Sequence, residues 1–403
     1  MTQSAQEARS RRERVAADHG STSADAGISG VLTRTDLFSS VLLAVLGFLS
    51  RYFTRGVLYF GDAPGIVQSI RDHRYVVEPP GYWLYARTGS LFRDPVFGLA
   101  FANEIFAGCG AAVFFLLCRK FGLPRPIAVV ATLAYVSIFF SWFAGDIRTS
   151  HGSQFLFAPL IVFSFLLYRE NRSLPRLIFC ALSFAAGAGM RPSDGAFMAP
   201  LFLFLVIRFV PDWKHRILLL ALAAAACLAW YIPTQMAMLN PSVNNTRDEL
   251  HGMASRTSLL LNGVNRYTIA NVVRVVLPML AAFWMLIPSI FARRTAMQNK
   301  ILALWIVPGL AFFLLVSMAE AQYLTFLTGG VILLAALAEN RRRATVALLV
   351  CFCFNTWLFL GARPIDSNGS VARAINFYVV KCSNYGIRHQ WNLNIGNGGT
   401  VPR

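Results

Sequence analysis

Apolar runs of the length that a membrane helix needs make up most of this chain, and short polar stretches separate them. A helix that crosses a bilayer needs about 20 mostly apolar residues, and only a helix or a closed barrel satisfies its backbone groups there. Eleven runs of the 403-residue sequence fit the helical template. They are 37–54, 96–117, 125–143, 152–168, 175–190, 195–210, 215–233, 270–291, 300–317, 322–338 and 344–361. The sequence therefore predicts an all-α, polytopic membrane protein with about eleven transmembrane helices.

The composition agrees with this class of protein. Hydrophobic residues make up 56% of the chain and charged residues only 14%, against about 25% charged residues in ordinary soluble domains. A net charge of +18 can indicate a nucleic-acid partner. Here, however, the arginines and lysines form small clusters between the apolar runs, as topology signals do. We therefore expect a membrane protein that binds no nucleic acid.

The basic clusters also predict an orientation. With the N-terminal tail in the cytoplasm, every second loop carries a cluster of arginine or lysine, which is the positive-inside pattern. The clusters are Arg119/Lys120/Arg125, Arg169/Arg172/Arg176, Lys214/Arg216, Arg293/Arg294/Lys300 and Arg341/Arg342/Arg343. Eleven spans keep this register to the end, with the N-terminus inside and the C-terminus outside. The compact size and basic tail favour a bacterial inner membrane.

The chain divides around a predicted membrane domain of residues 36–361. Residues 1–35 are polar and basic and are predicted to form a disordered cytoplasmic tail. Two long loops, 56–95 and 234–269, fall on the extracytoplasmic side, together with the C-terminal tail 362–403. The first of these loops combines acids, bases and a rigid turn most densely.

Asp62 is the first candidate residue in that loop, in the motif Gly61-Asp62-Ala63-Pro64. A carboxylate at a helix exit can have a raised pKa and accept a proton. Alternatively, Asp before Ala-Pro is a good helix N-cap. The two roles are compatible, and both stay open from the sequence.

The rest of the loop offers a surface helix and a stiff turn. Residues 65–75 are predicted to form an amphipathic helix on the membrane surface, with Ile66 and Ile70 on its apolar face. Arg71 and Arg74 then either meet lipid head groups or grip a lipid phosphate. The following turn, Glu78-Pro79-Pro80-Gly81-Tyr82, is rigid because proline fixes φ and extends the residue before it. It either places Glu78 and Tyr82 for a site or leads into an aromatic belt at the membrane surface.

Two short outer loops supply further candidates. In the first, Asp146 and Arg148 either pair with each other, or Arg148 and His151 face a cavity and hold an anion. In the second, Arg191 is either a further phosphate ligand or a helix end that snorkels to the interface. Glu104 is a candidate because a carboxylate inside a membrane span is costly unless it has a role.

Glu320 and Tyr323 close the last short outer loop and are secondary candidates. The sequence contains no Gly-rich phosphate loop, no His/Cys cluster with zinc spacing and no internal repeat of the kind that transporters use.

The order of these features resembles the GT-C superfamily of membrane glycosyltransferases, and most closely its dolichyl-phosphate-mannose-protein mannosyltransferase-like branch with its bacterial relatives. Gly61-Asp62 is similar to the acidic motif of the family's first outer loop. Glu78-Pro79-Pro80-Gly81-Tyr82 is similar to a His-Pro-Pro-Gly-Tyr turn, and Arg191-Pro192-Ser193 to an Arg/Lys-Pro-Ser/Thr break. Asp146 and Arg148 match an outer loop with an acid and an arginine. The resemblance covers residues 37–210. Glu78 replaces the usual His, so no role of that His is carried over.

The resemblance implies an inverting glycosyltransferase with a GT-C-like fold, in which the long first extracytoplasmic loop carries a surface helix. It would move a sugar from a polyprenyl-phosphate-linked donor to a lipid, glycan or protein acceptor on the extracytoplasmic face. Such a reaction needs a base for the acceptor hydroxyl and cations for the phosphate. Asp62 is the expected catalytic base or acceptor-orienting group. The candidates for binding phosphate or substrate are Arg71, Arg74, Glu78, Tyr82, Asp146, Arg148, His151 and Arg191. The resemblance leaves a divalent metal open.

Three other functions stay open from the sequence. A flippase or transporter for a lipid-linked glycan predicts paired charges at mid-membrane depth. An O-antigen-type polymerase or ligase predicts a long outer loop late in the chain, for which 234–269 is a candidate. A noncatalytic membrane subunit would keep the fold without the chemistry.

Overall fold

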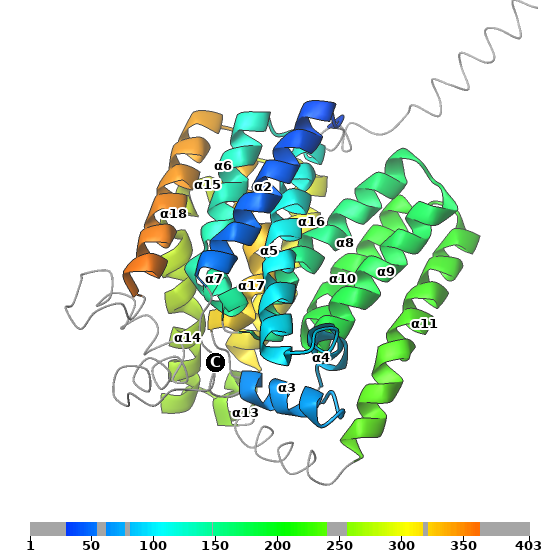
Figure 1. Ribbon diagram of the computed structural model, residues 1–403. Coiled ribbons are helices and arrows are strands. Elements are labelled where there is room, and N and C mark those ends of the chain that lie inside the picture. Colours follow the sequence, from blue (N-terminus) through cyan, green and yellow to red (C-terminus); the bar gives the residue numbers. More distant parts are fainter. Residues whose placement is uncertain are drawn as a thin grey trace, which may run out of the picture.

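The computed structural model describes residues 30–54, 62–76, 81–146, 148–239, 256–316 and 321–362, and all regular structure in these ranges is helical. The longer helices form a bundle (Figure 1). They are α2 (Arg34–Phe53), α5 (Pro95–Lys120), α6 (Arg125–Ser137), α7 (Phe139–Asp146), α8 (Gln154–Glu170), α9 (Leu174–Met190), α10 (Pro192–Phe209), α11 (Trp213–Met238), α14 (Arg266–Phe283), α16 (Ala296–Leu315), α17 (Thr325–Ala336) and α18 (Arg341–Ala362). The shorter ones are α3 (Asp62–Arg71), α4 (Trp83–Gly89), α13 (Leu259–Asn262), α15 (Ile287–Ile290), η2 (Ser150–Ser153), η3 (Trp284–Leu286) and η4 (Ala321–Leu324).

Each of the eleven predicted apolar runs coincides with a helical segment of the bundle. Eight helices are long and apolar enough to cross a membrane, and the bent pair of α6 and α7 gives a ninth if it counts as one span. The segments Leu174–Met190 and Ala321–Ala336 are apolar but shorter. The predicted all-helical membrane fold is confirmed, whereas the number of helices that cross the membrane stays a prediction.

One end of the bundle gathers basic residues that determine the predicted orientation. Asp36, buried at the start of α2, accepts hydrogen bonds from Arg119 Nε and Arg125 Nε, both at 3.0 Å. Lys120 of α5 pairs there with Glu170 of α8. The helices α3 and α4 lie at the opposite end (Figure 1). These ion pairs lie at one end of the bundle, as the positions of the basic clusters in every second loop predict. The compartment that each end faces stays a prediction.

The predicted run 125–143 is not one straight helix, because α6 and α7 are bent by 58° at Ile138. A break inside a membrane leaves backbone groups without water to bond. Here Arg51 Nη2 of α2 donates to the Val136 carbonyl at 2.9 Å, and Phe139 N donates to Asn355 Oδ1 of α18 at 3.3 Å. Side chains from two neighbouring helices thus support the bend.

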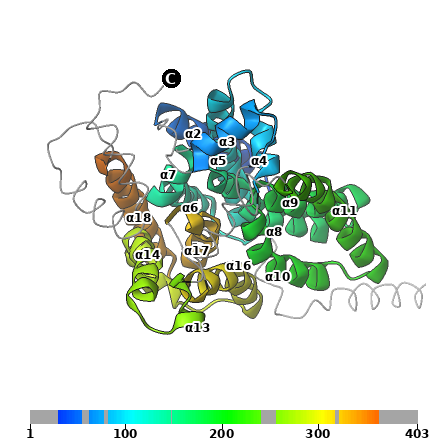
Figure 2. The ribbon, with the colours of Figure 1, turned by 90° about the horizontal axis from the view of Figure 1, so that it is seen from below.

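The surface helix is present as α3, over 62–71 instead of 65–75, and its surroundings differ from the prediction. Ile66 and Ile70 are buried in one cluster with Tyr85 of α4 and Leu99 of α5. Figure 2 shows α3 and α4 beside α5. The expectation that this apolar face meets the membrane is wrong, because α4, a helix without a clear sequence signal, provides a protein surface for it.

Two glycines allow α4 to pack closely. Gly81 has a left-handed φ of 81°, and a Cβ there would lie only 2.4 Å from Thr234 Cγ2 of α11. A Cβ on Gly98 of α5 would lie 2.4 Å from the carbonyl oxygen of Gly89. Gly81 and α4 are therefore held between α5 and α11.

The second long loop, predicted at 234–269, is shorter than expected, because helices extend into both of its ends. The helix α11 continues through Pro233 to Met238, and α14 begins at Arg266. Proline is tolerated inside membrane helices because neighbouring groups satisfy the freed backbone. Glu78 and most of the two predicted tails, 1–29 and 363–403, lie outside the described residues.

Candidate functional site

Arg191 is the centre of a buried polar and aromatic cluster at the end of the bundle that carries α3 and α4. Its side chain is 5% exposed. Its Nε donates to Asp194 Oδ1 at 3.0 Å, and its Nη1 lies 3.4 Å from Tyr82 Oη and 3.3 Å from Ser150 Oγ, both as acceptors. Its Cζ also lies 4.9 Å from the centroid of the Tyr323 ring, within cation–π range. Arg191 is therefore a fixed, buried cation and not a snorkelling helix end.

The local sequence explains where this arginine stands. Arg191 precedes Pro192, which disfavours helical backbone at the residue before it, and its backbone is extended, with φ −149°. It therefore separates α9 from α10. Asp194 lies in the first turn of α10, where the helix dipole favours a negative charge. One tight turn thus sets both partners of the ion pair.

His151 lies against the same cluster. It belongs to η2 and is 1% exposed, and its ring stacks on that of Tyr323 with centroids 4.6 Å apart and planes at 19°. Neither ring nitrogen has a hydrogen-bond partner among the residues that the structure describes. A buried polar atom without a partner costs about 1–3 kcal/mol. A ligand oxygen beside the ring would remove that cost.

We call these residues the Arg191 cluster: Tyr82, Ser150, His151, Arg191, Asp194 and Tyr323. Of its members, Tyr82, His151 and Arg191 are candidates from the sequence, and the structure brings them together. Tyr323 is only a secondary candidate there, yet its ring contacts both His151 and Arg191. A tyrosine at the edge of an apolar run has no local feature that marks it as part of a site.

Asp146 is anchored to the first helix. Its Oδ1 accepts a hydrogen bond from Thr54 Oγ1 at 3.2 Å, and that hydroxyl accepts one from Trp142 Nε1 at 2.8 Å. Arg51 lies with its Cζ 4.6 Å from the Trp142 ring. Arg148 is half-buried, and its φ of 61° is left-handed. A left-handed residue other than glycine costs about 1–2 kcal/mol, and such strain occurs often at functional sites.

Asp62 is the first residue of α3. A helix cap precedes the first helical residue, so Asp62 lies one position further into the helix than the predicted N-cap. The structure does not describe its side chain. The helix α3 packs on α4, which begins directly after Tyr82. The segment that carries Asp62 is therefore held next to the segment that brings Tyr82 to Arg191.

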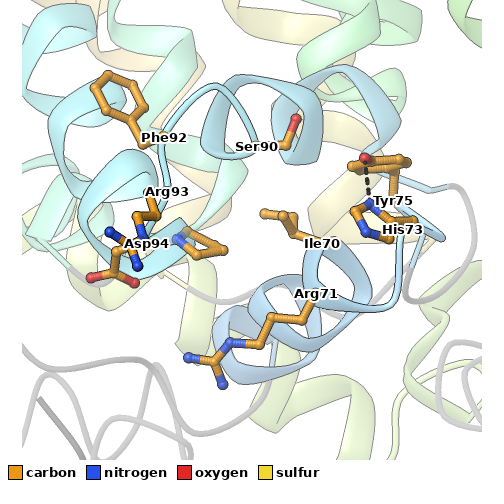
Figure 3. A pocket seen from close by; sticks show the side chains of 9 residues that line it. Ile70, Arg71, His73, Tyr75, Ser90, Phe92, Arg93 and Asp94 are labelled. Atoms are coloured by element: carbon orange, nitrogen blue, oxygen red, sulfur yellow. Dashed lines mark hydrogen bonds between the residues drawn. The ribbon is translucent and has the colours of Figure 1, made fainter.

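Arg71 and Arg74 are exposed, and the structure places neither in the buried cluster. Arg74 pairs with Asp72, and this hydrogen bond is the main cause that holds the pKa of the Asp72 carboxyl below its usual value. Arg71 lines a separate cavity (Figure 3). At a rise of about 1.5 Å per residue, the length of α3 separates Asp62 from Arg71 by about 14 Å. One small group cannot contact both.

Asn103, the neighbour of Glu104 in α5, connects that helix to the segment that runs from the end of α7 to η2. Its Nδ2 donates to the carbonyl oxygens of Gly145 and Thr149, at 3.0 and 3.3 Å. Glu104 itself is 2% exposed. Within the described ranges, no group of three or more His, Cys, Asp or Glu side chains could hold a metal ion.

The arrangement of the helices is similar to that of a solved structure, as the sequence predicts for the fold. This structure is ArnT from Cupriavidus metallidurans bound to undecaprenyl phosphate, with a TM-score of 0.54 over 88% of this chain and 70% of that chain. The two sequences are 15% identical, so the likeness shows the fold and does not distinguish the mannosyltransferase-like branch. No protein-family model matches the chain, and no curated protein sequence is significantly similar to it.

Proposed function

We propose that this protein is an integral membrane glycosyltransferase that moves a sugar from a polyprenyl-phosphate-linked donor to a lipid, glycan or protein acceptor. The observation that supports this best is the buried Arg191 cluster in a chain whose fold is similar to that of ArnT, a protein solved with undecaprenyl phosphate bound. Arginine suits phosphate because its planar fork donates two parallel hydrogen bonds. The reaction takes place on the extracytoplasmic face, and in bacteria this is the outer face of the inner membrane.

The chemistry follows from the donor. The oxygen of the acceptor hydroxyl attacks the anomeric carbon, and the bond from that carbon to the donor phosphate oxygen breaks. The electron pair leaves with the polyprenyl phosphate, while the hydroxyl proton passes to the carboxylate of Asp62. Attack from the face opposite the leaving group inverts the anomeric centre. Because phosphate is already a good anionic leaving group, the reaction needs a base and cations but no general acid.

The residues then take distinct roles. Arg191 binds the donor phosphate, and Arg148 adds positive charge from the neighbouring loop. Tyr82 and His151 offer a hydroxyl and an imidazole to the sugar, with His151 held by Tyr323. Asp146 positions the Arg148 loop through its hydrogen bond from Thr54. Glu78, in the same stiff turn as Tyr82, orients the acceptor.

Sugar transfer in membranes tests this proposal. Membranes that contain the native chain or Asp62→Asn are supplied with a panel of radiolabelled polyprenyl-phosphate sugars. The matched control is Asp72→Asn, which removes the same charge from an exposed carboxylate ten positions away that pairs with Arg74. We expect label to move to an acceptor with the native chain and Asp72→Asn, and not with Asp62→Asn at equal expression.

Each other outcome has a definite meaning. Transfer that survives Asp62→Asn keeps the enzyme class and rejects Asp62 as the base. Movement of labelled lipid across the bilayer without transfer indicates a flippase. Neither transfer nor movement with any donor contradicts the proposal and favours a noncatalytic subunit.

A further inference from the structure

An open cavity of about 500 Å³ lies where α3 ends and α5 begins, apart from the Arg191 cluster. Arg71, His73 and Tyr75 line it from the end of α3 and the turn that follows, and Ser90 and Arg93 line it from the segment between α4 and α5 (Figure 3). Its volume falls within the range of about 300–1,000 Å³ that is common for small-molecule sites. The cavity is thus large enough for a polar head group.

Two arginines give this cavity its charge. Arg71 and Arg93 lie on the same side of the cavity in Figure 3, both exposed. Neither forms a hydrogen bond or an ion pair with another residue in the described part of the chain. Asp94 also lines the cavity, but its carboxylate accepts hydrogen bonds from Val96 N at 3.0 Å and Phe97 N at 3.3 Å as the cap of α5. The cavity therefore keeps two guanidinium groups that can bind an anion.

The opposite side of the cavity is polar and has a fixed shape. His73 Nδ1 lies 3.2 Å from Tyr75 Oη, a hydrogen-bond distance. Both residues have a left-handed backbone, with φ of 57° and 59°, and Arg87 Cζ lies 4.5 Å from the centre of the Tyr75 ring. These contacts hold an imidazole and a phenol hydroxyl across from the two arginines (Figure 3).

Apolar side chains adjoin the charged side. Leu91 is 80% exposed and Phe97 is 41% exposed, and Ile70 lines the cavity itself. Leu91 comes shortly before α5 and Phe97 lies in its first turn, and α5 is a candidate membrane span of 26 residues. The end of a membrane span is where head groups meet lipid tails, so a ligand with an anionic head and an apolar tail fits both kinds of surface.

We propose that this cavity binds the phosphate of an anionic membrane-lipid head group. The phosphate oxygens accept charge-assisted hydrogen bonds from Arg71 and Arg93, the head-group hydroxyls contact Ser90 and the His73–Tyr75 pair, and the tails run along Leu91 and Phe97. The cavity is separate from the Arg191 cluster. Lipid binding in the cavity therefore does not depend on whether the chain is a glycosyltransferase.

Native mass spectrometry of the full chain in mild detergent tests this assignment, with phosphatidylglycerol as the anionic probe and phosphatidylcholine as the zwitterionic one. The test variant combines Arg71→Gln with Arg93→Gln. The matched control is Arg74→Gln, a nearby exposed arginine that already pairs with Asp72 and does not line the cavity. We expect the native chain to prefer phosphatidylglycerol, the double variant to bind it about tenfold more weakly, and Arg74→Gln to bind it as the native chain does.

Two results would overturn the assignment. Equal retention of phosphatidylglycerol by the native chain and the double variant, at equal melting temperature, shows that Arg71 and Arg93 do not hold the lipid. Displacement of the bound lipid by millimolar inorganic phosphate, with no preference between the two lipids, shows a site for soluble phosphate instead. The single variants Arg71→Gln and Arg93→Gln replace the double variant if its melting temperature is lower.

Discussion

The Arg191 cluster and the cavity of Arg71 and Arg93 are two arginine sites at the same end of the molecule, in opposite surroundings. Arg191 is buried and bonded to a carboxylate, a phenol and a serine hydroxyl. Arg71 and Arg93 are exposed and bond no described residue. A buried charge needs partners to offset its desolvation, whereas an exposed one keeps water that a ligand can replace. The buried, bonded Arg191 suits the precise positioning of one reacting group. The exposed Arg71 and Arg93 suit a ligand that binds and dissociates readily.

Loss of Arg191 should have the largest effect. In Arg191→Met, the buried Asp194 loses the partner that donates to it at 3.0 Å. Removal of one partner from a buried ion pair costs about 3–5 kcal/mol. We expect a correspondingly lower free energy of unfolding in detergent, and no sugar transfer.

The double variant Arg191→Met with Asp194→Leu separates stability from function. Replacement of both partners by apolar residues is often neutral or stabilising, so we expect most of the lost stability to return without transfer. If this variant transfers sugar at the native rate, Arg191 is a structural residue. The difference in burial between the two arginine sites then does not correspond to a difference in function.

A smaller loss is expected for Arg51, a buried arginine that bonds backbone. Arg51→Met leaves the Val136 carbonyl at the α6–α7 bend without the donor that it has at 2.9 Å. An unsatisfied buried group costs about 1–3 kcal/mol, and we expect a fall of that size in the free energy of unfolding. Asn355→Leu removes the acceptor of Phe139 N on the other side of the bend and serves as a matched test. If neither variant lowers stability, the bend does not depend on these side chains.

His151 allows a sharper separation of packing from binding. Phenylalanine there keeps the stacking on Tyr323 and removes two buried nitrogens that have no partner among the described residues. We expect His151→Phe to be as stable as the native chain, or more stable by about 1 kcal/mol, while transfer falls about tenfold. Unchanged transfer at unchanged stability would make His151 a packing residue.

The smallest effect on stability is expected at the open cavity. Arg71→Gln changes an exposed side chain without a described bond, so the free energy of unfolding should stay within about 0.5 kcal/mol of the native value. A larger loss would mean that Arg71 helps to hold α3 in place. The two arginine sites would then differ less in their contribution to stability than their exposure indicates.

The sequence predicts the helical runs and the basic end well, because bilayer thickness sets the length of an apolar run. It does not predict what an apolar face meets. The face of α3 with Ile66 and Ile70 has the pattern of a membrane-surface helix, yet it packs on protein. The bend at Ile138 lies inside an unbroken apolar run, and the side chains that bond the backbone there, Arg51 and Asn355, come from helices distant in the sequence.

The candidate site shows the same limit. His151 and Arg191 can be selected from the sequence because polar residues in the short predicted outer loops are few, and Tyr82 can be selected because it ends the stiff turn 78–82. Their meeting cannot be derived from it, since Tyr82 and Arg191 are 109 positions apart. Tyr323 joins the cluster through ring contacts alone, for which no spacing rule exists.

The place where a polyprenyl phosphate binds decides which of the two arginine sites holds the sugar donor. Undecaprenyl phosphate with a photoreactive group next to its phosphate is crosslinked to the full chain in membranes, and the modified peptides are identified by mass spectrometry. We expect crosslinks to peptides that contain Tyr82, His151 or Arg191, and their loss in Arg191→Met with Asp194→Leu. Crosslinks confined to residues 71–75 and 90–94, around Arg71 and Arg93, would contradict this expectation.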